Sequence, residues 1–242
     1  MSLPVGEWPA PYQQRLDELT ALVAARAPAR RPVRVLEAGA GAKSNFAFPE
    51  PNEVTGIDVS EGQLAHNERL AHVIVGDIQT TDFPPDYDLV VCWNVLEHVP
   101  DPAAAVAKLA AAVAPGGLLV IASPNLWSLK GVVTRFTPHT VHVWFHRNLM
   151  GRKDAGRGHV GPFRTFLRAA MAPDALTRHV IANGLESVRV EAFAGSQHNR
   201  LEQRYRAAKF GFGALSGASR VVSGRRVDLT HSDYIAVFRR PL

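Results

Sequence analysis

The sequence predicts an α/β fold in which a doubly wound, mostly parallel sheet of seven strands carries lid insertions. Short β-branched runs alternate with helix-like stretches, which is the pattern of parallel strands joined by crossover helices. A buried strand runs into a glycine turn near residue 39, and open α/β sheets bind ligands at such strand ends. The 242 residues are 46% hydrophobic, enough for one globular domain with a sizeable core. We therefore expect a single Rossmann-like domain over residues 1–242.

The apolar pattern defines the elements in chain order. Tyr12–Ala27 places four apolar side chains at helical spacing, and Pro28 and Pro32 end this lead-in helix. The expected strands follow it: Val33–Ala38, Val54–Asp58, Val73–Val75, Leu89–Trp93, Leu118–Ala122, Ser187–Phe193 and Tyr234–Arg239.

Two crossover helices have clear ends in the sequence. Pro102–Val113 begins with Asp101 as its N-cap and with proline in the first helical position. The run Pro115-Gly116-Gly117 is expected to stop it. The second helix, Pro173–Ala182, is expected to end near Asn183-Gly184.

Three connections depart from this alternation. Only residues 42–52, which include two prolines, separate the glycine turn from the second strand. A parallel crossover usually needs a dozen or more residues, so we expect a truncated or irregular one. Segments 126–172 and 194–229 are long and rich in Gly, Arg and His. Connections this long in a compact domain are usually lids or binding elements, so we expect both segments to be lid insertions.

The composition excludes several classes of protein. The single cysteine, Cys92, cannot form an intramolecular disulfide, and the first residues contain no apolar signal region. The longest apolar runs have five residues, against roughly 20 needed to span a bilayer. We therefore expect a cytoplasmic protein without a membrane span.

Charge divides the chain into two unlike parts. Residues 1–125 hold 8 Lys and Arg against 15 Asp and Glu, whereas residues 126–242 hold 19 against 7 and seven of the ten histidines. A basic second part favours an anionic ligand, nucleic acid or an acidic surface. The alternative is a set of solvated charges without a partner.

The glycine turn at Gly39-Ala40-Gly41 would let backbone approach a ligand closely. A nicotinamide dinucleotide site would want a third glycine at Ser44, which weakens that interpretation. Asp58 ends the second strand about 20 residues further on, where an acid can accept both ribose hydroxyls. Such an acid binds the ribose of nicotinamide and adenosyl cofactors alike. The alternative interpretation is that Asp58 only forms a turn after the strand, since Asp is common in turns.

Motifs in a fixed order separate these possibilities. They are Val35-Leu36-Glu37-Ala38-Gly39-Ala40-Gly41, Gly56-Ile57-Asp58-Val59-Ser60, Val75-Gly76-Asp77, Tyr87-Asp88-Leu89-Val90 running to Leu96-Glu97-His98-Val99, and Leu109 through Ala114-Pro115-Gly116-Gly117. At these spacings the chain resembles the class I S-adenosylmethionine-dependent methyltransferases over residues 33–125.

The resemblance implies S-adenosylmethionine as the cofactor and a set of residues that hold it. These are Glu37, Gly39, Ala40 and Gly41 against the methionyl part, Asp58 at the ribose hydroxyls, Val59 and Ile78 around the adenine, Gly76 and Asp77 near the adenine amino group, and Asn94 at the methionyl ammonium. Lys43 departs from the family pattern, which often has glycine there, and could meet the cofactor carboxylate or face solvent.

An oxygen nucleophile with a pKa far above neutrality benefits from a general base, and histidine suits that role. His98 and His142 are the leading candidates. His139, His142 and His146 are spaced i, i+3 and i+7, so a helix would align them on one face. A two-histidine metal site is the alternative, but no clear carboxylate cluster accompanies the run, so we expect no metal.

Other side chains in the insertions are candidates for binding the acceptor. They are His139, Trp144, His146, Arg147 and Tyr205. Aromatic residues there could instead anchor a lid to the core. Gln197–Phe212 is expected to form a basic amphipathic helix, as a lid wall or a subunit contact that would make a homodimer.

The expected function is O-methylation of a small hydroxylated acceptor, with a saccharide as first choice. The chain from Ser123-Pro124-Asn125-Leu126 to Trp144 is loosely similar to sugar methyltransferases of bacterial polysaccharide pathways, including actinobacterial enzymes that methylate mannosides in polymethylated polysaccharide synthesis. The alternative is an RNA-binding or RNA-modifying methyltransferase that uses the basic second part. The chain lacks the acid-and-proline signature that base amino methyltransferases have at the position of Asn94. Nucleic acid is therefore not the expected partner. A cofactor-binding scaffold without activity is a third alternative.

Overall fold

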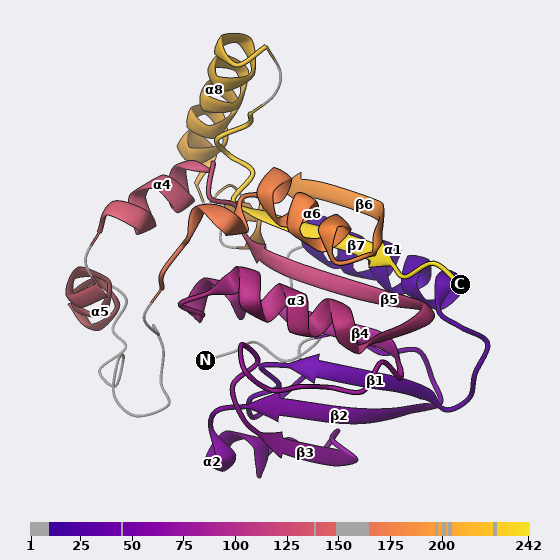
Figure 1. Cartoon of the computed structure of the whole chain (residues 1–242). Helices are drawn as coiled ribbons and strands as arrows, with labels where there is room; N and C mark the ends of the chain where they lie inside the picture. Colours follow the sequence, from indigo (N-terminus) through magenta and orange to yellow (C-terminus); the bar gives the residue numbers. More distant parts are fainter. Residues whose placement is uncertain are drawn as a thin grey trace.

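The computed structural model describes residues 10–44, 46–137, 139–148, 165–196, 198–199, 202, 205–224 and 227–242. Seven strands form one sheet in the order β3-β2-β1-β4-β5-β7-β6 (Figure 1). Their bounds are β1 Val33–Ala38, β2 Asn52–Asp58, β3 His72–Val75, β4 Tyr87–Trp93, β5 Val113–Pro124, β6 Glu186–Phe193 and β7 Asp233–Arg239. The predicted fold class and all seven predicted strands are confirmed, and most strands start one to five residues earlier than expected.

The sheet is parallel over most of its width and antiparallel at one edge. β2 pairs with β1 and β3, and β4 pairs with β1 and β5, all in parallel. β7 lies between β5 and β6 and runs antiparallel to both. The strand order reverses between β1 and β4, and a crevice opens at the carboxyl ends of strands where an order reverses.

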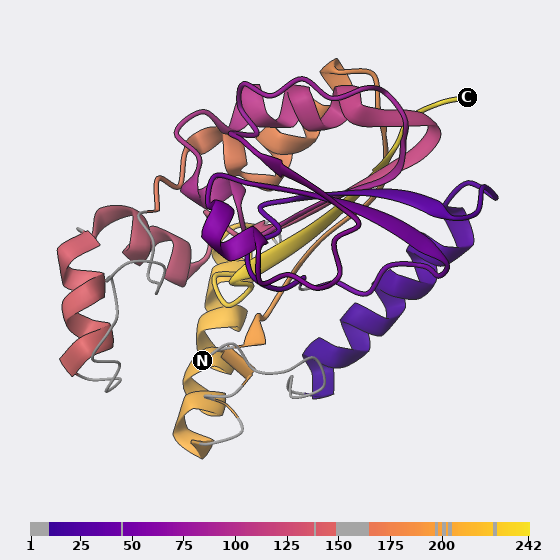
Figure 2. The ribbon, with the colours of Figure 1, turned by 90° about the horizontal axis from the view of Figure 1, so that it is seen from below.

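Helices cover both faces of the sheet (Figure 2). α3 (Pro102–Ala112) and α6 (Pro173–Ala182) pack on one face, and α1 (Ala10–Arg26) packs on the other. Successive side chains of a strand point to opposite faces, so Val35 joins the core under α1 and Leu36 joins the core under α3. The short elements are α2 Glu61–Leu64, η1 Leu96–His98 and η2 Ala169–Met171.

Most predicted helix ends are confirmed. α1 covers the predicted lead-in helix, and α6 has the predicted bounds. Asp101 caps α3 by accepting hydrogen bonds from the amides of Ala103 and Ala104, both at 3.1 Å. The predicted stop of α3 is wrong, because α3 ends at Ala112 and Pro115-Gly116-Gly117 already belongs to β5.

The register explains this difference in the stop of α3. Tyr87 pairs with Val113, but Leu89 pairs with Leu118, so β5 is irregular over the intervening residues. Gly116 has a φ of +75°, which favours glycine. The Pro-Gly-Gly run therefore bends a strand instead of making a separate turn.

The first crossover is irregular, as predicted. The described residues between β1 and β2 contain no helix, and Pro49 and Phe48 are buried there. This connection leaves the glycine turn without the usual following helix.

The described parts of the two insertions contain helices. α4 (Leu129–Phe136) and α5 (His139–Asn148) follow β5, and α8 (Arg206–Val222) lies between β6 and β7 (Figure 1). The predicted bounds of the second-insertion helix, Gln197–Phe212, are wrong, because α8 starts later and runs ten residues further. Within the described part of the chain, no helix is long and apolar enough to cross a membrane.

Candidate functional site

The glycine turn after β1 packs tightly against the loop that follows β4. Gly39 and Gly41 have φ values of +67° and +52°. A Cβ on Gly39 would lie 2.3 Å from a methyl carbon of Val95, so a side chain cannot be accommodated there. The amides of Gly39 and Ala40 donate to the carbonyl of Ile57 at 2.8 and 3.1 Å. The turn is therefore held against both neighbouring strands.

Asp58, at the end of β2, organises the same turn. Its carboxylate accepts hydrogen bonds from the amides of Gly41 at 3.1 Å and Ser60 at 2.9 Å. Asn67 supports the turn from the other side, because its buried side-chain amide donates to the carbonyl of Ala40 at 3.1 Å. The sequence analysis missed Asn67, which stands in no motif.

Glu37 and Ser44 form a buried polar pair behind the turn. The hydroxyl of Ser44 donates to a carboxylate oxygen of Glu37 at 2.5 Å. Ser44 occupies the position where a dinucleotide fingerprint would have glycine. Its hydroxyl gives this position a polar role that a glycine could not fill, and Lys43 beside it is exposed.

The ends of β2 and β3 lie side by side. Asp58 pairs with Val75 in the parallel ladder, and the amide of Gly76 donates to the carbonyl of Asp58 at 3.0 Å. The Asp77 carboxylate accepts hydrogen bonds from the backbone amide and the side-chain amide of Gln79, each at 2.8 Å. The structure therefore brings the two acids together at one edge of the sheet.

Two apolar side chains accompany these acids. Ile78 is buried, whereas Val59 is 73% exposed. An exposed valine next to a polar strand end leaves an apolar surface that a flat ring could cover.

Asn94 takes an unusual backbone conformation at the end of β4. Its φ is +55°, which asparagine tolerates better than most residues, and its amide donates to the carbonyl of Ala122 at 2.8 Å. This geometry turns the chain sharply at the mouth of a cavity that Asn94 helps to line.

The cavity has a volume of about 240 Å³ and lies at the carboxyl ends of β4 and β5, beside the start of β7. Its lining combines aromatic and charged side chains. These are Tyr12, Trp93, Asn94, Glu97, His98, Ala122, Ser123, Pro124, Lys130, Phe193, Ser196, Asp233 and Tyr234. Of the two predicted catalytic histidines, His98 lines this cavity.

Among the acids that line the cavity, Glu97 has the pKa that is raised most. Only 5% of the residue is exposed, and the hydroxyl of Ser123 donates to its carboxylate at 3.5 Å. Burial raises the pKa of Glu97 to about 8, and the charge of Asp233 adds to this effect while Lys130 opposes it. The raised pKa favours the protonated form of Glu97, which can donate a hydrogen bond.

Asp233 and Lys130 form the charged pair of the cavity. The Lys130 ammonium nitrogen lies 3.6 Å from a carboxylate oxygen of Asp233, and the Ser232 hydroxyl donates to this carboxylate at 2.7 Å. A Cβ on Gly195 would lie 1.5 Å from a carboxylate oxygen of Asp233, so glycine is needed at that position. The charge of Asp233 also raises the pKa of Tyr12, after the larger effect of burial.

The sequence analysis singled out neither Glu97, Lys130 nor Asp233. Glu97 precedes His98 inside a family motif, and this position was the sequence feature that could have identified Glu97 as a site residue. Lys130 and Asp233 are 103 positions apart in the chain and carried no local signal.

Three of the predicted acceptor-binding residues have described side chains, and the cavity is lined by none of these, which are Trp144, Arg147 and Tyr205. α5 contains His139, His142 and His146, so the predicted helical spacing is present, but their side chains are outside the described set. Trp144 and Tyr205 are exposed, and the described side chains of α5 do not line the cavity. Within the described residues, no group of three or more His, Cys, Asp and Glu is placed to hold a metal ion.

Comparison with known proteins agrees with this geometry. Residues 12–172 match the family described as "Methyltransferase domain". The ubiquinone biosynthesis O-methyltransferase of Bordetella bronchiseptica is 34% identical over 130 residues, which cover 46% of this chain and 54% of that protein. The trans-aconitate 2-methyltransferase of Methylobacterium nodulans is 30% identical over 133 residues, 50% of this chain and 51% of that protein. The chain thus spans about half the length of these curated relatives.

Solved structures share the fold at low sequence identity. An S-adenosylmethionine-dependent methyltransferase from Mesorhizobium loti superposes with a TM-score of 0.54 at 16% identity, covering 96% of this chain and 98% of that one. The magnesium protoporphyrin IX methyltransferase from Synechocystis with bound SAH gives 0.52 at 16% identity, covering 94% and 82%. The chain therefore belongs to the class I S-adenosylmethionine-dependent methyltransferase family, and its cofactor is S-adenosylmethionine.

Proposed function

We propose that the protein transfers the methyl group of S-adenosylmethionine to a hydroxyl oxygen of a small acceptor, with a saccharide as the acceptor class. The observation that carries this proposal is the polar cavity beside Asn94, at the carboxyl ends of β4 and β5. The similarity to ubiquinone biosynthesis O-methyltransferases supports oxygen as the nucleophile.

The cofactor would lie along the carboxyl ends of β1 to β4. In this proposal Gly39, Ala40 and Gly41 face the methionyl part, near Glu37 and the carbonyl of Asn94. The free lone pairs of Asp58 accept the ribose hydroxyls. Asp77 with Gly76 faces the adenine edge, while Val59 and Ile78 contact its ring. The cofactor supplies an electrophilic methyl group, and the chain aligns the acceptor with it.

The cavity suits a small polar acceptor. Pockets for drug-sized ligands usually occupy about 300–1,000 Å³, and the cavity here is smaller. Trp93 and Phe193 offer apolar surfaces, while Glu97, Ser123 and the Lys130–Asp233 pair offer hydrogen bonds. A ring with several hydroxyls meets both kinds of surface.

Both insertions contribute to this cavity. Lys130 comes from segment 126–172 and Ser196 comes from segment 194–229. We therefore keep the proposal of one domain whose core at 33–125 binds the cofactor and whose insertions build the acceptor pocket.

His98 is the proposed general base. The acceptor oxygen bonds to the methyl carbon as the carbon–sulfur bond breaks, and a nitrogen of His98 takes the hydroxyl proton. Glu97, in its protonated form, donates a hydrogen bond to the acceptor. His142 remains the second candidate base, because α5 follows the cavity element α4 directly along the chain.

His98→Gln is expected to lower kcat by about a hundredfold or more, because a positioned base contributes about 10²- to 10⁴-fold. Cofactor affinity should stay unchanged, and the rise of kcat with pH should disappear. His142→Gln is measured beside it, and the exposed His179→Gln on α6 is the control. Wild-type kcat and pH dependence in both His98→Gln and His142→Gln would rule out a histidine base.

The acceptor class is tested with labelled methyl donor. The assay offers mono- and disaccharides, polyphenols and RNA to the purified protein. Label should appear on a saccharide hydroxyl. Label on RNA, or on a nitrogen of any acceptor, would contradict the proposal.

A further inference from the structure

The helices of the two insertions expose an apolar surface that the cavity does not use. Phe136, Phe210 and Val222 are 79%, 77% and 89% exposed. We call this surface the apolar face. Its described members are Trp127, Leu129, Val132, Val133, Phe136, Val141, Trp144, Phe210, Val221 and Val222. Single exposed apolar residues are common, but a larger group of them within the two insertions indicates an interaction site.

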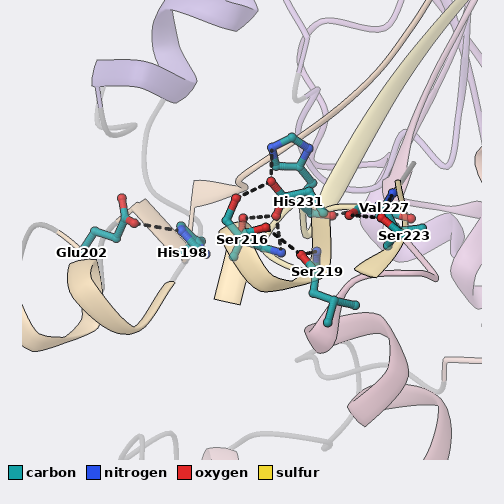
Figure 3. Close-up of polar contacts among 11 residues, drawn as sticks. His198, Glu202, Ser216, Ser219, Ser223, Val227 and His231 are labelled. Atoms are coloured by element: carbon teal, nitrogen blue, oxygen red, sulfur yellow. Dashed lines mark hydrogen bonds and ion pairs between the residues drawn. The ribbon is translucent and has the colours of Figure 1, made fainter. Parts of the chain in front are cut away.

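Serine side chains attach one side of α8 to the segment that follows the helix (Figure 3). Ser216 donates to the carboxylate of Asp228 at 2.6 Å, Ser219 accepts from the amide of Leu229 at 3.3 Å, and Ser223 accepts from that of Val227 at 2.9 Å. These serines recur at helical spacing, so they form one stripe along the helix. Phe210 and Val221 lie outside this stripe and are exposed.

α4 is attached near the same place. A Cβ on Gly131 would lie 2.2 Å from the carbonyl oxygen of Asn125, so α4 starts in close contact with the end of β5. The amide of Leu129 donates to the carbonyl of Leu229 at 2.9 Å, which joins α4 to the segment that follows α8. Both helices project from this junction (Figures 1 and 2).

The charge of these segments has one sign. Residues 126–153 contain five Lys and Arg, residues 203–227 contain six, and neither segment contains Asp or Glu. Arg135 is exposed on α4, and Lys209 and Arg220 are exposed on α8. The partner of this surface must therefore offer negative charge as well as an apolar environment.

The need for both negative charge and an apolar environment distinguishes the possible partners of the apolar face. A second copy of the chain would bring like charges together, and a nucleic acid would match the charge while leaving the aliphatic and aromatic side chains in water. Helices with basic and large apolar side chains lie in the interface of an anionic bilayer, where both groups are satisfied. We propose that the apolar face docks on the surface of an anionic lipid bilayer.

The first test measures binding of the full chain to vesicles by co-sedimentation. Vesicles of phosphatidylcholine mixed with phosphatidylglycerol should bind the protein, and vesicles of phosphatidylcholine alone should bind it more weakly. Each neutralised surface charge, in Arg135→Gln, Lys209→Gln or Arg220→Gln, should lower the partition coefficient about fivefold. Added salt should weaken binding further.

The second test removes the apolar anchors. Phe136→Ser and Phe210→Ser should each lower the partition coefficient about tenfold or more, since each removes a large apolar side chain from the bilayer interface. Ile181→Ser and Arg178→Gln, on the exposed side of α6, are the matched controls and should bind like the wild type. Circular dichroism verifies that all variants fold.

Three results of the vesicle and solution measurements, and one of a competition with RNA, would overturn the inference. The first three concern vesicles and oligomeric state. They are failure of the wild type to bind anionic vesicles, equal binding to both vesicle types, and a dimer in solution that Phe136→Ser or Phe210→Ser converts to a monomer. Binding to RNA that outcompetes vesicles and survives both serine substitutions would also overturn it. None of these measurements requires methyl transfer, so they stand apart from the proposed function.

Discussion

Asp58→Ala should weaken binding of S-adenosylmethionine by about a hundredfold or more. Hydrogen bonds to a charged group contribute about 1.5–3 kcal/mol each, and the two ribose hydroxyls would lose their acceptor. The same substitution removes the bond that the Gly41 amide donates, so the glycine turn loses a support. Isothermal titration with S-adenosylmethionine and with its demethylated product measures the loss.

Two variants separate binding from folding in this experiment. Asp58→Asn keeps an oxygen for one turn amide but loses the charge, so its affinity should lie between the wild type and the alanine variant. Asp174→Asn, an exposed acid at the start of α6, should bind like the wild type. If Asp58→Ala binds the cofactor with wild-type affinity, the ribose assignment is wrong.

Glu97→Gln should change how stability depends on pH. The pKa of Glu97 is raised from its ordinary value of 4.5 to about 8 in the folded protein, chiefly by burial. Between these values the folded state holds a proton that the unfolded state has released, so the free energy of unfolding falls as pH rises. Each pH unit in this window lowers the free energy of unfolding by about 1.4 kcal/mol, and the full loss is of order 5 kcal/mol.

Glutamine cannot titrate, so it should remove this decline while keeping the shape of the protonated acid. The measurement is the free energy of unfolding in urea at a series of pH values, taken as the difference between variant and wild type. That difference should grow from about pH 4.5 and level off above about pH 8. Glu186→Gln, an exposed acid in β6, is the control and should follow the wild type. Parallel curves for Glu97→Gln and the wild type would contradict a raised pKa.

The local pattern of the sequence predicted the strands and the cofactor half of the site. Buried parallel strands are continuous apolar runs, and a glycine turn must follow β1 because backbone there packs against Val95 and Ile57. Asp58 and Asp77 stand at fixed offsets from those strands, so their meeting at one sheet edge could be read from order alone. The roles given to them toward the cofactor remain predictions.

Helix bounds in the insertions were harder to predict for a physical reason. α8 is glycine-rich, and hydrogen bonds between its serines and residues 227–229 help to stabilise it. These partners lie beyond the end of the helix, and helical periodicity does not indicate which residues will contact it. The Pro-Gly-Gly run was misassigned for a similar reason, since its conformation follows from pairing between β5 and β4.

The amino-acid sequence alone determined the succession of strands along the chain, the position of the glycine turn and the family of the chain. These features depend on patterns within short segments. Only the tertiary structure decided the acceptor cavity. The antiparallel insertion of β7 beside β5 pairs Pro124 with Asp233, and α4 then brings Lys130 to the same acid. Burial of Glu97 next to that pair raises its pKa, and burial is a property of packing that no local pattern encodes.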